Sequence, residues 1–193
     1  MLRATAKRTT DWLVQGGSIS EADREVYEFG LDKLFSMLSN LIFTAVIGLL
    51  FGMFVQMIAF YSAYIALRVY AGGYHADRQL RCFFISIGIV IPCLLAIHYQ
   101  QVWNVPVVFF GLLAAGVVIL ALLGPVGNKN KMPDELEKTV YRRRLLRNLV
   151  IITTGAVILS MLALQDYAAA VLCGVLLSTA TAIVGKVKLL LQA

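Results

Sequence analysis

The sequence predicts an all-α fold, a polytopic membrane bundle of about six transmembrane helices with both termini in the cytoplasm. Three observations predict it. Of the 193 residues, 60% are hydrophobic and 15% charged. The mean hydropathy of +0.80 excludes a water-soluble globular domain. Long charge-free runs recur along the chain, and lysine and arginine occur only between alternate runs.

The charge-free runs define the expected spans. Between Lys33 and Arg68 lie 34 uncharged residues. As one helix they would extend about 50 Å, whereas a hydrocarbon core is about 30 Å thick. A turn between Gly48 and Gly52 therefore divides this run. The expected spans are residues 33–49, 52–69, 82–103, 105–123, 148–164 and 167–185. A total of four or five spans stays open if the first run is partly re-entrant.

The positive charges predict the orientation, because cytoplasmic loops retain lysine and arginine. With the N-terminus inside, all 17 positive residues fall in segments 1–33, 68–81, 124–147 and 186–193. Asp166 is the charged residue of the outer turns. The net charge of +6 is thus mainly an orientation signal, and nucleic acid is not an expected partner.

The whole chain, 1–193, is expected to form one membrane domain. Its amphipathic N-terminal segment, 1–32, has Ser20 as an expected N-cap, followed by apolar residues at helical spacing up to Phe29. This pattern predicts a helix along the inner membrane surface that leads into the first span. In the basic cytoplasmic segment 124–147, Pro133 suits a first helical position, and acids precede arginines, as the helix dipole favours. That helix is expected to enter the fifth span.

Reactive side chains are concentrated between the second and third spans, in the segment from Arg68 to Cys82. A cysteine nucleophile acts as a thiolate, which imidazolium, arginine and a helix N-terminus all favour. Cys82 opens the third span, next to Arg81 and seven residues after His75. In one straight helix these two side chains would be about 10.5 Å apart along the axis, whereas proton transfer needs about 3 Å.

Two arrangements satisfy that distance. Either a bend at Gly72 and Gly73 returns His75 towards Cys82, or the two residues pair across a dimer. From the residues alone, an incidental histidine and cysteine at a membrane edge remain an alternative. No cofactor or metal is expected, because one histidine and one cysteine leave a tetrahedral zinc site half empty.

The segment from Arg68 to Cys82, with its glycine pair, His-Ala and cysteine seven residues after the histidine, resembles the accessory gene regulator B family of bacterial membrane endopeptidases. The resemblance implies a cysteine peptidase of the bacterial cell membrane that cuts the precursor of a quorum-sensing autoinducing peptide. It implies His75 as general base and Cys82 as nucleophile. Arg68 and Gly73, beside Gly72, match supporting positions, and a homodimer agrees with the family.

In the implied reaction, the Cys82 thiolate attacks a precursor carbonyl at the cytoplasmic face and His75 protonates the departing amine. The precursor's own cysteine then attacks the thioester and closes a thiolactone. The basic segment is expected to contact anionic membrane lipids. A second expected use is to dock an acidic part of the precursor on Lys129, Lys131, Arg142, Arg143 and Arg144.

The remaining candidates have simpler interpretations. Cys93 and Cys173 lie inside spans and are expected to serve packing. His98 lies near the opposite interface, and Asp77 is expected to be solvated. The competing class is a small helical membrane transporter or scaffold without peptidase activity. Against that class, the six expected spans of this chain lack, apart from their ends, the intramembrane charges that usually mark a substrate pathway.

Overall fold

The computed structural model describes residues 2–72, 79–103, 105–126 and 134–191. The predicted all-α fold is confirmed. The elements are α1 (Leu2–Gln15), the 3₁₀ turn η1 (Glu21–Asp23), α2 (Arg24–Leu50), α3 (Phe54–Ala71), α4 (Gln79–His98), α5 (Gln100–Trp103), α6 (Pro106–Leu123), α7 (Glu135–Met161) and α8 (Gln165–Leu191).

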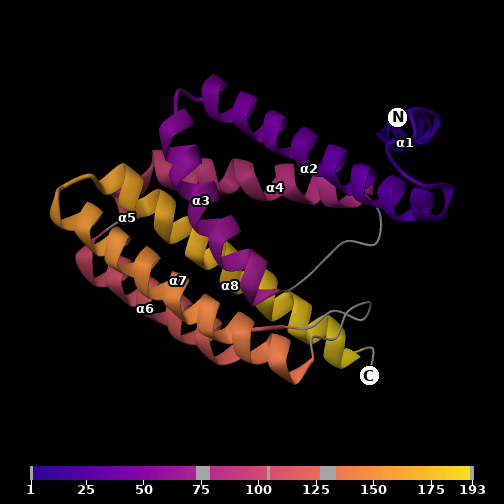
Figure 1. Ribbon diagram of the computed structural model, residues 1–193. Helices are drawn as coiled ribbons and strands as arrows, with labels where there is room; N and C mark the ends of the chain where they lie inside the picture. The colour runs from indigo at the N-terminus through magenta and orange to yellow at the C-terminus, as the bar shows by residue number, and fades with distance from the viewer. Residues whose placement is uncertain (1, 73–78, 104, 127–133, 192–193) are drawn as a thin grey trace.

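Five of these helices, α2, α3, α6, α7 and α8, are long and apolar enough to cross a membrane. Helix α4 adds a shorter apolar segment over residues 85–98. These apolar helices indicate a membrane protein, and they follow the order of the six predicted spans. In Figure 1 the start of α2, the end of α3, the start of α4 and the end of α8 lie towards one side of the bundle. The α2–α3 and α7–α8 turns lie towards the other side (Figure 1).

The turns between spans differ in detail from the predicted ones. Helix α2 continues through Gly48, which packs against Met57, and the chain reverses at residues 51–53. Gly52 adopts a φ of +66°, which glycine accepts without strain. The α7–α8 turn lies at residues 162–164, earlier than expected, because Gln165 and Asp166 begin α8. A carboxylate there complements the positive end of the helix dipole.

The N-terminal prediction needs a correction. Residues 24–29 do not form a separate surface helix, because they are the first turns of the continuous α2. The Ser20 hydroxyl makes no cap bond and instead donates to the Asp23 carboxylate, 2.6 Å away. The separate N-terminal helix is α1, whose contact with the start of α2 includes an Arg24–Asp11 ion pair at 2.5 Å. Because α2 has no proline or break near its charged start, the helix extends beyond the apolar run.

Helix α7 confirms the expectation of a helix that enters the fifth span. It is continuous from Glu135 to Met161, and its N-cap is Asp134, whose carboxylate accepts a 2.7 Å bond from the Glu135 N–H. Pro133, the expected first helical residue, lies outside the described part of the chain.

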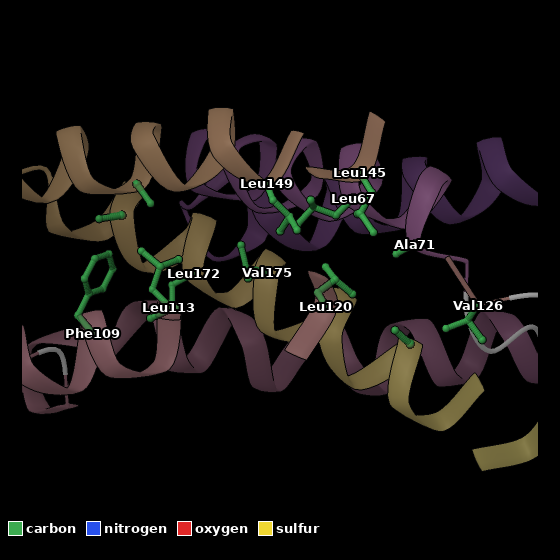
Figure 2. Packing of buried hydrophobic residues seen from close by; sticks show 13 residues of the cluster. Leu67, Ala71, Phe109, Leu113, Leu120, Val126, Leu145, Leu149, Leu172 and Val175 are labelled. Atoms are coloured by element: carbon green, nitrogen blue, oxygen red, sulfur yellow. The ribbon is translucent and has the colours of Figure 1, made fainter. Parts of the chain in front are cut away.

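Helix α8 is the centre of the bundle and packs against α3, α6, α7 and α4. Small residues permit this close approach. A Cβ on Gly174 of α8 would lie 2.7 Å from the Phe60 carbonyl oxygen of α3. A Cβ on Gly116 of α6 would lie 3.1 Å from the Val175 Cγ1 of α8. Figure 2 shows Leu67, Ala71 and Leu145 at one end of this core, with Phe109 at the opposite end.

A second apolar cluster joins α3, α4 and α8. It includes Phe60, Leu94 and Cys173, and Cys93 packs against it. Both thiols are free and surrounded by apolar side chains, in keeping with the packing role expected for them.

Candidate functional site

The described part of the chain ends on both flanks of the candidate site. His75, Gly73, Lys129 and Lys131 lie outside the described residues. Cys82 lies in the first turn of α4, as the sequence predicted, but its side chain is also outside the described part. The folded return of His75 towards Cys82 is therefore still a prediction. The structure describes the end of α3, residues 66–72, and the helices that pack against it.

Arg68 and Gly72 form a local cap at the end of α3. The Arg68 guanidinium donates to the Gly72 carbonyl oxygen, four residues later. A cation here also complements the negative end of the helix dipole. Gly72 has φ +69° and ψ −150°, a conformation that a side chain would strain. Both residues thus determine how the chain leaves α3 towards His75.

The chain just after α6 contacts the end of α3 through backbone atoms. The Val126 N–H donates to the Ala71 carbonyl oxygen at 2.8 Å, and Gly72 and Val126 form a parallel β-bridge. A Cβ on Gly72 would lie 2.1 Å from the Val126 carbonyl oxygen. Figure 2 shows Val126 beyond Ala71 at this end of the core. The chain therefore enters the two predicted site segments, 73–78 and 127–133, from adjacent points.

Helix α7 supports the same end of α3 with a stripe of four residues. The stripe follows an i, i+3, i+4, i+7 pattern, which places its members on one helix face: Tyr141, Arg144, Leu145 and Asn148. The Asn148 amide donates to the Ala66 carbonyl oxygen at 2.8 Å.

The other members of the stripe pack at the following turn of α3. The Arg144 guanidinium lies 5.9 Å from the centre of the Tyr70 ring, a cation–π arrangement. The Tyr141 ring lies 6.2 Å from the same ring. Leu145 is fully buried, 2.5 Å from where a Cβ on Gly124 would lie. The end of α3 is thus held by hydrogen bonding, aromatic contact and close packing together.

The predicted basic residues of α7 divide into two kinds. Arg142 and Arg143 are exposed, and among the described residues neither guanidinium has an ion-pair or hydrogen-bond partner. Arg144 is also exposed, but its guanidinium lies over Tyr70. The structure therefore brings Arg68, Gly72 and Arg144 to one end of α3, whereas it shows no such contact for Arg142 and Arg143 among the described residues.

On the other flank, α2 holds the start of α4. The Asn40 amide of α2 donates to the Ser86 hydroxyl at 3.0 Å, one turn after Cys82. The amide oxygen of Asn40 is buried and has no hydrogen-bond partner among the described residues. His98 ends α4, about 24 Å along the axis from Cys82 at 1.5 Å per residue. This separation excludes His98 as a base for Cys82 within one straight helix.

Sequence reasoning missed Tyr70, Val126, Asn148 and Asn40. For the asparagines a signal existed, because an amide inside an apolar helix needs a hydrogen-bonding partner. No local signal identifies Val126, which pairs with Ala71 through its backbone while its side chain packs in the core. Its pairing with Ala71 joins segments more than 50 residues apart.

The fold defines a class, the polytopic helical membrane proteins, and comparison with known proteins defines the family. The model of the accessory gene regulator B family matches residues 6–182, so the chain belongs to that family. Accessory gene regulator protein B of Staphylococcus haemolyticus is 28% identical over 79% of this chain and 78% of its own length. An AgrB-like protein of Clostridium perfringens is 29% identical over 63% of this chain and 58% of its own length. No solved structure matches the chain.

Proposed function

We propose that this chain is a membrane cysteine endopeptidase that removes the C-terminal tail of a quorum-sensing peptide precursor. Membership of a family associated with peptide processing supports the proposal. The observation that carries it is the segment from Arg68 to Cys82, which lies inside the family match and delivers Cys82 to the first turn of a helix. Unpaired N–H groups and the positive dipole end at that turn favour a thiolate.

The proposed reaction has two acyl transfers. The Cys82 thiolate attacks the scissile carbonyl and forms a C–S bond. As the C–N bond breaks, His75 donates a proton to the departing amine, and the tail leaves while the rest of the precursor stays bound to Cys82 as a thioester. A cysteine of the precursor then attacks the thioester, which releases Cys82 and forms a cyclic thiolactone. The exchange of one thioester for another is nearly balanced in energy. The cyclisation therefore depends on holding the incoming thiol close and excluding water.

The same proposal assigns the basic residues near the site to substrate and lipid binding, at the cytoplasmic face. Arg142 and Arg143 present exposed charges that suit an acidic part of the precursor, together with Lys129 and Lys131. Reversal of charge at Arg142 and Arg143 should raise KM more than it lowers kcat. Arg144 is omitted from that variant because its contact with Tyr70 is structural. A fall in kcat with KM unchanged would contradict docking.

Alanine variants of the three cysteines test the central assignment. Processing of a co-expressed precursor, followed by mass spectrometry, should be abolished by Cys82→Ala and by His75→Ala. Cys93→Ala and Cys173→Ala should retain it, because those thiols pack among apolar side chains. Loss of processing with either of these two variants, but not with Cys82→Ala, would refute the assignment.

Co-expression of two inactive copies distinguishes the intramolecular site from the proposed homodimer. If His75 of one copy served Cys82 of another, His75→Ala and Cys82→Ala chains together would recover part of the processing. An intramolecular pair predicts no recovery. If the precursor were processed equally in cells that lack this chain, the transporter or scaffold class would take the place of the peptidase.

A further inference from the structure

Helices α3 and α4 lead into and out of the segment that contains His75 and Cys82, and both are held by α8 and α2. Helix α3 packs against α8, α7 and α2, whereas α4 packs against α8 and α2. The separation between the end of α3 and the start of α4 is therefore set largely through third helices. This separation determines how far the site segment must reach.

Near the site, one asparagine hydrogen bond joins α7 to α3 and another joins α2 to α4, and each fixes the direction of its contact. Asn148 of α7 donates to the Ala66 carbonyl oxygen of α3 at 2.8 Å, and Asn40 of α2 donates to the Ser86 hydroxyl of α4 at 3.0 Å. Apolar packing tolerates sliding and rotation, whereas a hydrogen bond requires a particular distance and angle. In an apolar surrounding, a lost amide partner is not readily replaced.

One bond lies within two turns of the end of α3, and the other lies about one turn from Cys82. Ala66 is six residues before Gly72, where the described part of α3 leads into the site segment. Ser86 is four residues after Cys82, so the two share a face of α4. Figure 1 shows α2 above α4, nearest to it where α4 begins, and α7 below α3, so the two bonds come from opposite sides of the bundle.

We propose that Asn148 and Asn40 are positioning residues of the peptidase site, which together set the separation between the α3 end and the start of α4. The proposal rests on the proposed function of His75 and Cys82. Neither asparagine touches the reacting atoms. Each acts through the helix that it holds, so its loss should move His75 relative to Cys82 while the bundle stays folded.

The test measures the reactivity of Cys82 in the full-length chain, reconstituted in lipid nanodiscs. Iodoacetamide is the probe, and mass spectrometry assigns the alkylation rate to each cysteine over a series of pH values. In the unaltered chain, Cys82 should react at least about ten times faster than Cys93 at pH 7, as an activated thiolate does. Asn148→Leu and Asn40→Leu should each slow Cys82 about tenfold, because small displacements weaken the pairing with His75.

Gln100→Leu is the matched control. The Gln100 amide also joins two helices, since it donates to the Asp166 carboxylate at 3.0 Å, but it lies at the other end of the bundle. Its loss should lower the thermal unfolding temperature without changing the alkylation rate of Cys82. A general loss of stability is thereby separated from a loss of positioning. If a leucine variant fails to give a monodisperse folded protein, the corresponding Asn→Ser variant replaces it, because a serine hydroxyl is too short to reach the same acceptor.

The outcomes separate the two proposals. An unaltered chain in which Cys82 reacts no faster than Cys93 overturns the peptidase site itself. A fast Cys82 that keeps its rate and pH profile within twofold in both asparagine variants overturns the positioning role only. In the double variant, Cys82 should be alkylated about as fast as in the slower of the two single variants, because both bonds set the same separation. Multiplicative slowing would mean that the two asparagines act on Cys82 independently and would overturn their joint role.

Discussion

Helices α2 and α8 are each 27 residues long and similar in apolar character, yet they occupy opposite environments. In the most apolar 18-residue window, 67% of α8 is buried inside the protein but only 11% of α2. Their side chains explain the difference. Helix α8 presents alanines, glycines, serine and threonine to its neighbours, whereas α2 exposes large residues such as Met37, Ile42 and Leu49.

The comparison shows that hydropathy identifies a span without telling which neighbour the span meets. Lipid and protein are equally apolar, so burial between helices depends on how closely their backbones approach. Small residues permit that approach on several sides of α8. Helix α2 relies instead on a few polar contacts, among them Thr44 with Tyr61 at 3.1 Å and Asn40 with Ser86.

The largest expected contrast comes from truncating a leucine in each helix. Leu172 of α8 is fully buried, whereas Leu49 of α2 is 60% exposed. Leu172→Ala should lower the free energy of unfolding by about 2 to 3 kcal/mol, because the shorter side chain leaves a cavity and loses its packing contacts. Leu49→Ala should change it by less than about 0.5 kcal/mol. Unfolding titration with SDS in bicelles measures both, and equal losses would refute the distinction.

Alanine in place of glycine should produce effects of opposite sign. At Gly174 of α8 the new Cβ would meet the Phe60 carbonyl oxygen at 2.7 Å and the Ala63 Cβ at 3.0 Å, so α3 and α8 must separate. Gly174→Ala should cost about 2 kcal/mol of unfolding free energy. At Gly30 of α2 a Cβ meets nothing within 4 Å. There alanine should stabilise the helix by about 0.5 kcal/mol, because it restricts the unfolded chain. The same titration checks the signs.

The smallest contrast concerns hydrogen bonds. Thr179 of α8 donates to the Gly116 carbonyl oxygen at 3.1 Å, and Thr44 of α2 shares a bond with Tyr61. Valine at either position keeps the shape and removes the hydroxyl, which should cost about 0.6 kcal/mol in each case. Equal costs would show that polar contacts are worth the same in both helices and that packing alone separates them. A Thr44→Val cost several times larger would show that α2 depends on this bond.

Much of the fold follows from the sequence because charge patterning in a bilayer is governed by large energies. A charge inside the hydrocarbon is expensive, so charge-free runs predict the spans and basic residues predict the loops. The residue at which a helix begins or ends depends on capping and dipole interactions of only about 1 kcal/mol. The extension of α2 back to Arg24 and the start of α8 at Gln165 were therefore missed.

The candidate site was predictable in part for a similar reason. A cysteine at the start of a span, with arginine and histidine nearby, predicts a reactive thiolate from one short segment. The contacts that hold this segment join distant parts of the chain. Asn148 bonds to Ala66 over 82 positions, and Val126 pairs with Ala71 through backbone atoms that are identical in every non-proline residue. Such pairing leaves no pattern in either segment alone.

The backbone pairing of Gly72 with Val126 also affects how mutational scans of this chain should be interpreted. Any L-amino acid at position 72 would place its Cβ against the Val126 carbonyl oxygen, so nearly every substitution there should fail. Position 126 should accept other apolar side chains of similar size, because its backbone makes the contact while its buried side chain packs in the core. A scan would therefore score position 72 as indispensable and position 126 as tolerant of conservative apolar changes. Intolerance at position 72 would report the meeting of two peptide backbones and should not be counted as evidence of a role in catalysis.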